Sequence, residues 1–315
     1  MTRPGRTANR LRGLQVPPSR MTPALITDLA HRLTTRDRAI LALVWKHRVL
    51  TTPQLTAMFF RTSERTQQRL RQLHHLHALT RFRPWAPVGT EPMHWVLGPA
   101  GAHVLAAEQG ISFRKFGYRH DAVLSISLSS RLGHQVGVND FFAHLHAYAR
   151  YRGNGTEVDQ WWSEQRCAEL WGDLARPDAF GRWVEVPEKL HPSTSPQGID
   201  FFLEHDTGTE PLKRVVAKLA GYAELADSTG ITTPVLFSLP STAREANLRR
   251  LLGTPEVPVA TAVHTPAAPG RVFGHPGPAG PIWLPAGTTG PRQRLATLPD
   301  AWGGYHDPHS HPGTA

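Results

Sequence analysis

The segment from Thr52 to His77 reads TPQLTAMFFRTSERTQQRLRQLHHLH and predicts two short helices joined by a tight turn. Thr52 and Pro53 are a typical N-cap and first-turn proline, so the first helix should begin here. Ser63 is a second N-cap residue, and the helix that follows should run from Glu64 to about His77. This arrangement is typical of the helix-turn-helix motif, whose second helix enters the major groove of DNA.

The second helix has an apolar side and a polar side when its residues are placed on a helical wheel. The apolar side carries Thr66, Leu70, Leu73 and His77. The polar side carries Arg65, Gln68, Arg71, Gln72 and His75. Arg can donate a pair of hydrogen bonds to guanine, and Gln can pair with adenine. The sequence therefore predicts a face that reads DNA bases, and the alternative is a solvated polar face on an ordinary helix.

The residues on both sides of this segment complete a winged helix-turn-helix. An apolar stripe predicts an earlier helix over residues 36–47. After the second helix, the pattern predicts two strands over 79–83 and 93–97, joined by a turn that contains Pro and Gly. Arg81 and Arg83 lie on this hairpin, where they could follow a phosphate backbone. Three helices and a hairpin together predict the winged fold.

The positive charge lies in the N-terminal part of the chain. The 315 residues carry a net charge of +10. Residues 1–120 contain 19 Lys and Arg against 5 Asp and Glu, residues 121–252 contain 13 against 17, and residues 253–315 contain 3 of each. Lys and Arg that neutralise phosphates release counterions, which drives binding to nucleic acid. The distribution predicts double-stranded DNA as a partner, and an arginine-rich composition is the alternative explanation.

Changes in composition and pattern divide the chain into five parts. We expect a disordered basic arm at 1–21, a winged-helix DNA-binding domain at 22–110, a linker at 111–120, an α/β domain at 121–252 and a largely irregular Pro/Gly-rich tail at 253–315. The predicted fold class is therefore α+β, with an N-terminal winged helix followed by an α/β domain.

The sequence lacks the features of a membrane or secreted protein. It has no window of the roughly 18 consecutive apolar residues that a membrane helix needs, and residues 1–20 lack the apolar core of a secretory signal. We therefore expect a cytoplasmic protein without a membrane partner. Cys167 is the only cysteine, which excludes an intrachain disulfide and a thiolate zinc site.

The predicted α/β domain has the element order αβββαβα. Its expected elements are a long helix over about 123–151 with a possible break at 133–137, strands over 157–164, 179–186 and 199–205, a helix over 211–226, a strand over 234–239 and a helix over 243–252. Asp178 opens the second strand, and Glu204 lies near the end of the third. Acidic groups on neighbouring strands can converge on a hard divalent cation that helps water attack a phosphate.

The order of these elements and the positions of the two acids resemble the PD-(D/E)xK nuclease core. The resemblance implies a restriction-endonuclease-like αβββαβ fold in which Asp178 and Glu204 are ligands of Mg²⁺, with Glu164 as a third candidate acid. The sequence departs from the pattern at position 206, where Asp206 replaces the expected lysine. Lys213 or Lys218 on the next helix could replace that lysine by extending past the apolar stripe of the helix.

The candidate catalytic residues are therefore Asp178, Glu204 and Lys218, and Mg²⁺ is the only cofactor that the sequence indicates. The missing lysine at position 206 favours an inactive scaffold over an active nuclease. In that case Asp178 caps or turns a strand, and Glu204 lies at an exposed strand end.

Six motifs along the chain resemble the replication-relaxation family. They are LTTRDRAIL at 33–41, LTTPQL at 50–55, RLRQL at 69–73, VNDFF at 138–142, RPDA at 176–179 and FLEHDTGTEP at 202–211. The first three alone would fit many winged helices, whereas the ordered series is more specific. The resemblance implies a DNA-binding protein that is tied to replication control of plasmids or conjugative elements.

The leading hypothesis is a DNA-binding protein of a mobile element without catalytic activity. Its winged helix would bind duplex DNA, and its second domain would support assembly or bind a protein partner. The alternative is a metal-dependent DNA nuclease or nickase that the winged helix targets. A third hypothesis is a transcription repressor whose second domain binds a small ligand.

Overall fold

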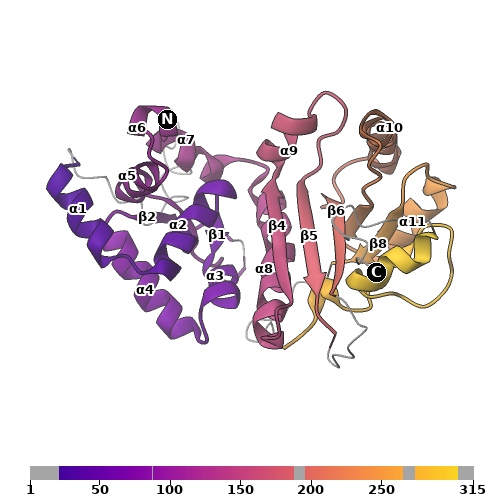
Figure 1. Cartoon of the computed structure of the whole chain (residues 1–315), viewed down its shortest axis with the longest axis horizontal. Helices are drawn as coiled ribbons and strands as arrows, with labels where there is room; N and C mark the ends of the chain where they lie inside the picture. Colours follow the sequence, from indigo (N-terminus) through magenta and orange to yellow (C-terminus); the bar gives the residue numbers. More distant parts are fainter. Residues whose placement is uncertain (1–20, 87, 188–195, 265–273, 304–315) are drawn as a thin grey trace, which may run out of the picture. The chain divides into compact units, whose positions relative to one another are not determined.

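The computed structural model describes residues 21–86, 88–187, 196–264 and 274–303 (Figure 1). The chain divides into two units, Met1–Asn139 and Asp140–Ala315. The first unit combines helices with a three-stranded sheet, and the second combines helices with a six-stranded sheet. The fold class is therefore α+β, which confirms the prediction at this level.

Short helices and a small antiparallel sheet form the first unit. The helices are α1 (Pro23–Arg32), α2 (Thr35–Lys46), α3 (Thr52–Phe59), α4 (Ser63–His75), α5 (Pro99–Glu108), α6 (Phe113–Phe116), α7 (His120–Leu124) and the 3-10 helix η2 (Ser125–Leu128). The strands are β1 (Leu50–Thr51), β2 (Leu79–Phe82) and β3 (His94–Leu97), in the order β1-β3-β2. Strands β2 and β3 pair antiparallel, so the predicted hairpin is present.

The helices α3 and α4 each begin one residue before the predicted position. Thr51 caps α3 by accepting a hydrogen bond from the backbone N–H of Gln54, and the Gln54 side chain bonds back to Thr51. Thr52, the predicted cap, cannot form this reciprocal capping box, because the residue three positions later is Leu55, which has no amide or carboxyl group. Thr62 likewise caps α4 in place of Ser63.

A mixed sheet with helices on both faces forms the second unit. The helices are α8 (Leu132–Arg152), which begins in the first unit, α9 (Glu164–Trp171), α10 (Leu212–Thr229), α11 (Thr242–Leu252) and the 3-10 helices η3 (Gly277–Ala279) and η4 (Leu295–Trp302). The strands are β4 (Glu157–Ser163), β5 (Ala179–Glu185), β6 (Gln197–His205), β7 (Val235–Leu239), β8 (Val259–Val263) and β9 (Leu284–Pro285). Their order in the sheet is the same as their order in the chain.

The pairing in this sheet changes from antiparallel to parallel at β6. Strands β4, β5 and β6 are antiparallel neighbours, whereas β6, β7 and β8 run parallel and are connected through α10 and α11. The β4–β5 register shifts between Val158 and Gln160, which marks a β-bulge or similar irregularity in β4. At the other edge, the two-residue strand β9 pairs with β8.

Aromatic side chains fill the space on both faces of the sheet. On one face, Phe142 of α8 stacks on Trp161 of β4 and lies against Phe201 of β6. Gly181 of β5 makes room for these rings, because a Cβ atom at this position would lie 2.4 Å from the Phe201 ring. On the other face, Tyr222 of α10 packs against Phe202 of β6 within the main hydrophobic cluster.

Two parts of the chain that lacked predicted structure are ordered elements. The tail after Gly253, which the sequence predicts to be largely irregular, contributes β8 and β9 to the sheet and also forms η3 and η4. Strand β8 is a nearly continuous apolar run, VATAV, whose residues are almost all buried. Such a short run is difficult to recognise in a segment that is rich in Pro, Gly, Ala and Thr. The predicted linker at 111–120 contains α6. Residues 1–20 of the predicted basic arm at 1–21 lie outside the described residues.

The helices also differ from the prediction in three places. Helices α1 and α9 were not expected, although Thr22 and Pro23 repeat the cap and proline pattern of α3. The long helix predicted over 123–151 is broken before α8, at residues 129–131 rather than at 133–137. Serine hydroxyls in this region bond to backbone carbonyls three residues earlier, as Ser127 does to Leu124, and such bonds compete with regular helix.

The described part of the chain contains no helix that is both long enough and apolar enough to span a membrane.

Candidate nucleic-acid interface and acidic cluster

Helix α4 separates its buried and exposed residues as the sequence predicts. The buried side carries Thr66, Leu70, Leu73 and His74. The exposed side carries Arg65, Gln68, Arg71, Gln72 and His75, which we call the α4 face. His77, which the wheel places on the buried side, lies beyond the end of the helix with a φ of 56°. All five side chains of the α4 face are therefore available to a partner.

An ion pair between Asp37 of α2 and Arg69 of α4 fixes the position of α4. Asp37 is fully buried. Arg69 Nε donates to Asp37 Oδ1 at 2.9 Å and Arg69 Nη2 donates to Oδ2 at 2.5 Å. The backbone N–H and the hydroxyl of Thr34 donate to the same carboxylate at 2.8 and 2.6 Å. The α4 face is thus oriented by the buried carboxylate of Asp37, whose hydrogen bonds the sequence patterns do not reveal.

The pKa of Asp37 reflects this arrangement. Burial alone would raise the pKa of the carboxyl, but the hydrogen bonds from Arg69 and Thr34 outweigh it and hold the pKa below its ordinary value. Asp37 is therefore ionised at neutral pH, and its charge depends on Arg69 for compensation.

The two arginines of the hairpin have different environments. Arg83 is exposed, whereas Arg81 is half-buried and its guanidinium lies 6.0 Å from the centre of the Trp95 ring. The Nε of Arg81 is buried and has no hydrogen-bond partner within the described residues. Arg83 is therefore the better placed of the two to reach a phosphate, and Arg81 contributes to packing at Trp95.

The turn of the hairpin exposes an aromatic side chain. Trp85 is 65% exposed, and it lines a cavity of about 360 Å³ together with Pro84 and residues 127–130. The aromatic rings of Trp95 and His94 are buried. Trp95 donates a hydrogen bond to Thr52 Oγ1 at 2.9 Å, and His94 lies 2.9 Å from the carbonyl oxygen of Pro92. Only Trp85 among these is accessible to a ligand.

One exposed basic residue beside α4 was not singled out from the sequence. Arg61 lies in the turn between α3 and α4 and is exposed. Its position just before a helix that is expected to enter the major groove is the signal that could have identified it.

Asp178, Glu204 and Lys218 meet in the second unit, together with Tyr222. We call these four residues the Glu204 cluster. Lys218 Nζ lies 2.7 Å from Glu204 Oε2, and the hydroxyl of Tyr222 donates to Glu204 Oε1 at 2.5 Å. Asp178, which precedes β5, accepts a hydrogen bond from the backbone N–H of His205 at 2.8 Å. Residues from β6, from α10 and from the segment before β5 thus lie close together.

The electrostatics of the Glu204 cluster raise the pKa of Glu204. Burial and the nearby charge of Asp178 raise the pKa of Glu204 to about 7, against the opposing effects of Lys218 and Tyr222. Burial lowers the pKa of Lys218, but Glu204 and Asp178 outweigh it, so the pKa is raised and Lys218 stays charged. One ammonium group therefore faces two buried carboxyl groups.

Three of the acids and bases considered from the sequence lie outside the cluster. Asp206 pairs with Arg244 of α11 and accepts a hydrogen bond from the backbone N–H of Gly208 at 2.8 Å. Lys213 is exposed, and Glu164 forms the first residue of α9. The expectation that Glu164 supplies a third acid is wrong, because the ranges that the structure describes contain no group of three His, Cys, Asp or Glu side chains arranged to hold a metal ion. The expectation of an exposed strand end is also wrong, because Glu204 is only 3% exposed.

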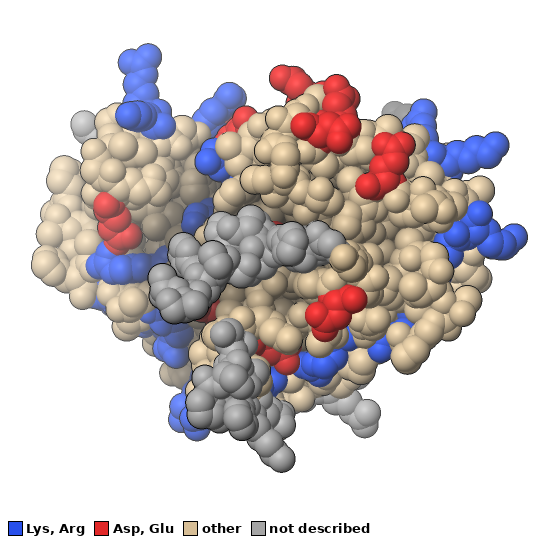
Figure 2. Space-filling view, turned by 45° about the vertical axis from the view of Figure 1, so that its right-hand side comes forward, with Lys and Arg blue, Asp and Glu red and all other residues tan. Residues whose placement is uncertain are grey.

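Charged side chains are scattered on the face of the molecule in Figure 2. Asp and Glu form several separate groups there, with Lys and Arg between and around them on a largely uncharged surface.

The structure so far defines an α+β protein with an exposed polar helix face in one unit and a buried acidic cluster in the other. The chain matches the family model described as replication-relaxation over residues 41–237. The match covers more than half of the chain, so the chain belongs to the replication-relaxation family. It includes the α4 face and the whole Glu204 cluster. No curated protein and no solved structure matches the chain.

Proposed function

We propose that the chain is a DNA-binding protein that acts in the replication or relaxation of a plasmid or mobile element and does not itself cut DNA. Membership of the replication-relaxation family suggests the process. The net charge of +14 over residues 1–120, with 19 basic against 5 acidic residues, favours DNA as the partner.

The first unit acts as a winged helix-turn-helix in this proposal. Helices α3 and α4 form the helix-turn-helix, α4 enters the major groove, and the β2–β3 hairpin is the wing. The observation that carries the proposal is the α4 face, where five exposed side chains able to bond bases or phosphates lie opposite a packed side that the Asp37–Arg69 ion pair holds in place. Arg83 contacts a phosphate beside the groove, and Trp85 packs against the DNA at the tip of the wing.

The second unit acts as a nuclease-like scaffold that has lost its activity and contacts a protein partner. Two features support this assignment. Lys218 already neutralises the carboxylate of Glu204, and Asp206, which occupies the position of the usual lysine, pairs with Arg244 instead of facing the cluster. Both features reduce the attraction of the cluster for a divalent cation.

One observation favours a second candidate function, a metal-dependent nuclease. Asp178, Glu204 and Lys218 converge, and a lysine from α10 can substitute in space for the one that position 206 lacks. A divalent cation could displace Lys218 from Glu204, which would leave the ammonium group free to stabilise charge on a phosphate.

The DNA-binding proposal is tested by fluorescence anisotropy of the full chain with labelled duplex DNA at several salt concentrations. Affinity should fall steeply with salt, with a slope of about −0.9 for each phosphate contacted. The double variant Arg65→Ala, Arg71→Ala should weaken binding, and Arg83→Ala should flatten the salt slope. Arg214→Ala removes an exposed arginine of α10 and is the matched control, for which we expect unchanged binding.

Two results would overturn the DNA-binding proposal. The first is binding that does not depend on salt, or no binding at about 50 mM salt. The second is an equal loss of affinity in the α4 variant and in Arg214→Ala.

Incubation with supercoiled plasmid and millimolar Mg²⁺ or Mn²⁺ separates the two candidate functions. We expect no cleavage by the wild-type chain. Cleavage that is lost in Asp178→Ala, Glu204→Ala and Lys218→Ala would make the nuclease assignment correct, whereas cleavage that persists in all three variants would indicate a contaminating enzyme.

A further inference from the structure

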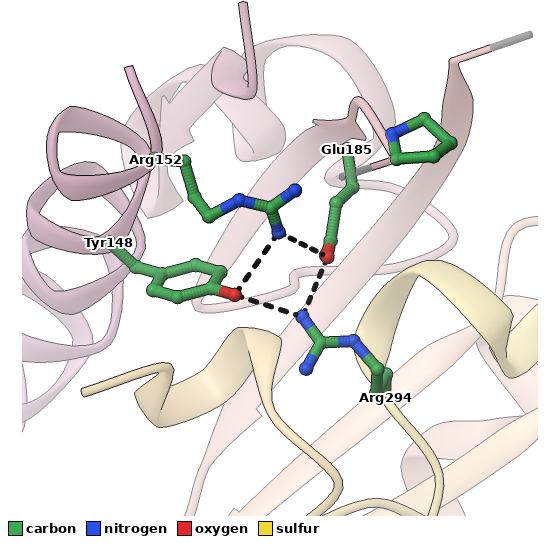
Figure 3. A pocket seen from close by; sticks show the side chains of 5 residues that line it. Tyr148, Arg152, Glu185 and Arg294 are labelled. Atoms are coloured by element: carbon green, nitrogen blue, oxygen red, sulfur yellow. Dashed lines mark hydrogen bonds and ion pairs between the residues drawn. The ribbon is translucent and has the colours of Figure 1, made fainter. Parts of the chain in front are cut away.

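Two arginines, a tyrosine and a glutamate form a closed network in the second unit, and none of the four belongs to the Glu204 cluster (Figure 3). Arg152 Nη1 of α8 donates to the hydroxyl oxygen of Tyr148 at 3.2 Å and to Glu185 Oε1 at 3.1 Å. Arg294 Nη2, just before η4, donates to the same two oxygens at 3.2 and 2.6 Å. The four groups surround a cavity of about 280 Å³ that Pro187 also lines.

The network contains more hydrogen-bond donors than acceptors. The phenol oxygen of Tyr148 already accepts from both guanidinium groups, so its own hydrogen must be donated elsewhere. Within the described residues, neither this hydrogen nor the Nε and Nη1 groups of Arg294 have an acceptor. A ligand that fits this set must present hydrogen-bond acceptors to these donors.

The charge of the network also selects an anion. Two guanidinium groups face one carboxylate, and arginine stays protonated in proteins. The carboxylate of Glu185 is occupied on both oxygens, because Oε2 accepts from Trp183 Nε1 at 3.1 Å. Arg152 is almost buried, with an 8% exposed side chain, whereas the Arg294 side chain is 34% exposed. The network is therefore cationic, and its more accessible arginine lies at the opening.

We propose that this cavity binds the phosphate group of a small phosphate ester or of free phosphate. The terminal oxygens of a phosphate dianion can accept from Nη1 of Arg294 and from the hydroxyl of Tyr148. Hydrogen bonds from a guanidinium group to phosphate are charge-assisted and therefore strong. The volume of about 280 Å³ is close to the lower end of small-molecule pockets, so it has room for a phosphate and a small organic group. The assignment does not depend on DNA binding by the first unit.

Isothermal titration calorimetry of the full chain at low salt, with inorganic phosphate and with a nucleoside 5′-monophosphate, tests the site. We expect saturable binding that Arg294→Gln weakens about tenfold or more, because the variant loses charged hydrogen bonds. Tyr148→Phe removes only the hydroxyl and should weaken binding by a few-fold, with a small fall in melting temperature because two guanidinium groups lose an acceptor. Arg250→Gln, which changes an exposed arginine of α11, is the matched control.

The outcomes separate a ligand site from a purely structural network. Loss of binding in Arg294→Gln and Tyr148→Phe, with Arg250→Gln unchanged, supports the site, and the tighter of the two ligands identifies the source of the phosphate. Equal binding by the wild-type chain and both pocket variants would mean that the ligand binds elsewhere, such as at the basic first unit, and would overturn the proposal. The absence of any saturable heat up to millimolar ligand would overturn it as well.

Discussion

Replacing Arg69 with leucine should destabilise the first unit far more than any change on the exposed side of the same helix. The variant removes the guanidinium that donates two hydrogen bonds to Asp37, and it leaves a fully buried carboxylate with only Thr34 as a partner. Breaking a buried ion pair by removing one partner costs about 3–5 kcal/mol. Domains are stable by about 5–15 kcal/mol in total, so this loss is a large fraction of the stability of the unit.

The matched control is Arg65→Leu, which changes an exposed arginine one turn away on α4. Exposed positions usually tolerate substitution within about 0.5 kcal/mol. Amide hydrogen exchange of peptides from α2 and α4 reports the free energy of unfolding of this unit alone, so the stability of the second unit does not affect the measurement. We expect faster exchange in Arg69→Leu and no change in Arg65→Leu.

The pH dependence of the stability difference provides an independent check that the unpaired carboxylate of Asp37 causes the loss. In the wild-type chain the pKa of Asp37 is lowered, so the stabilisation from its ionised form is present above the ordinary pKa of 3.8 and is lost as the pH falls through the folded value. In Arg69→Leu, burial dominates and raises the pKa of Asp37, so acid should stabilise the variant relative to the wild type. The difference between the two proteins should shrink between pH 7 and pH 4. Equal exchange in Arg69→Leu and Arg65→Leu, or a difference that does not change with pH, would refute this reasoning.

Three further predictions concern the base contacts, the acidic cluster and the sheet. Gln68→Ala or Arg71→Ala should lose about 1–3 kcal/mol of discrimination at particular base pairs in a binding-site selection, with nearly unchanged melting temperature, whereas Leu70→Ala should cost about 2–5 kcal/mol of stability by leaving a core cavity. The pKa of Glu204 is raised to about 7, so its contribution to the free energy of unfolding is full below pH 4.5 and is lost as the pH rises through 7. In urea unfolding at several pH values, the free energy of unfolding of Glu204→Gln should lack this part of the pH dependence. Gly181→Ala should cost about 1–3 kcal/mol in the same assay, because its Cβ would overlap aromatic rings on α8 and β6.

The exposed face of α4 could be predicted from the sequence because helical periodicity is a local property. Leu70 and Leu73 repeat at the spacing of a buried stripe, so Gln68 and Arg71 must face solvent. The predicted cap, Thr52, was wrong: Thr51 caps the helix, because Gln54 lies three residues after it and closes the capping box.

Other parts of the two sites depend on contacts between residues that are distant in the sequence. The periodicity of α10 places Lys213 and Lys218 equally well beside its apolar stripe, and the packing of α10 on β6 selects Lys218 for Glu204. The phosphate pocket joins Tyr148 to Arg294, which are 146 positions apart, so no local pattern could reveal it.

The edges of the six-stranded sheet limit how copies of the chain could associate. An exposed edge strand with free N–H and C=O groups is a template for pairing with another molecule. Strand β4 disrupts that template through its irregularity at Val158 and Gln160 and carries the acidic residues Glu157 and Asp159. Strand β9 is only two residues long and ends in Pro285, which has no N–H to donate. Fibre-like growth by strand addition is therefore disfavoured at both edges of this sheet.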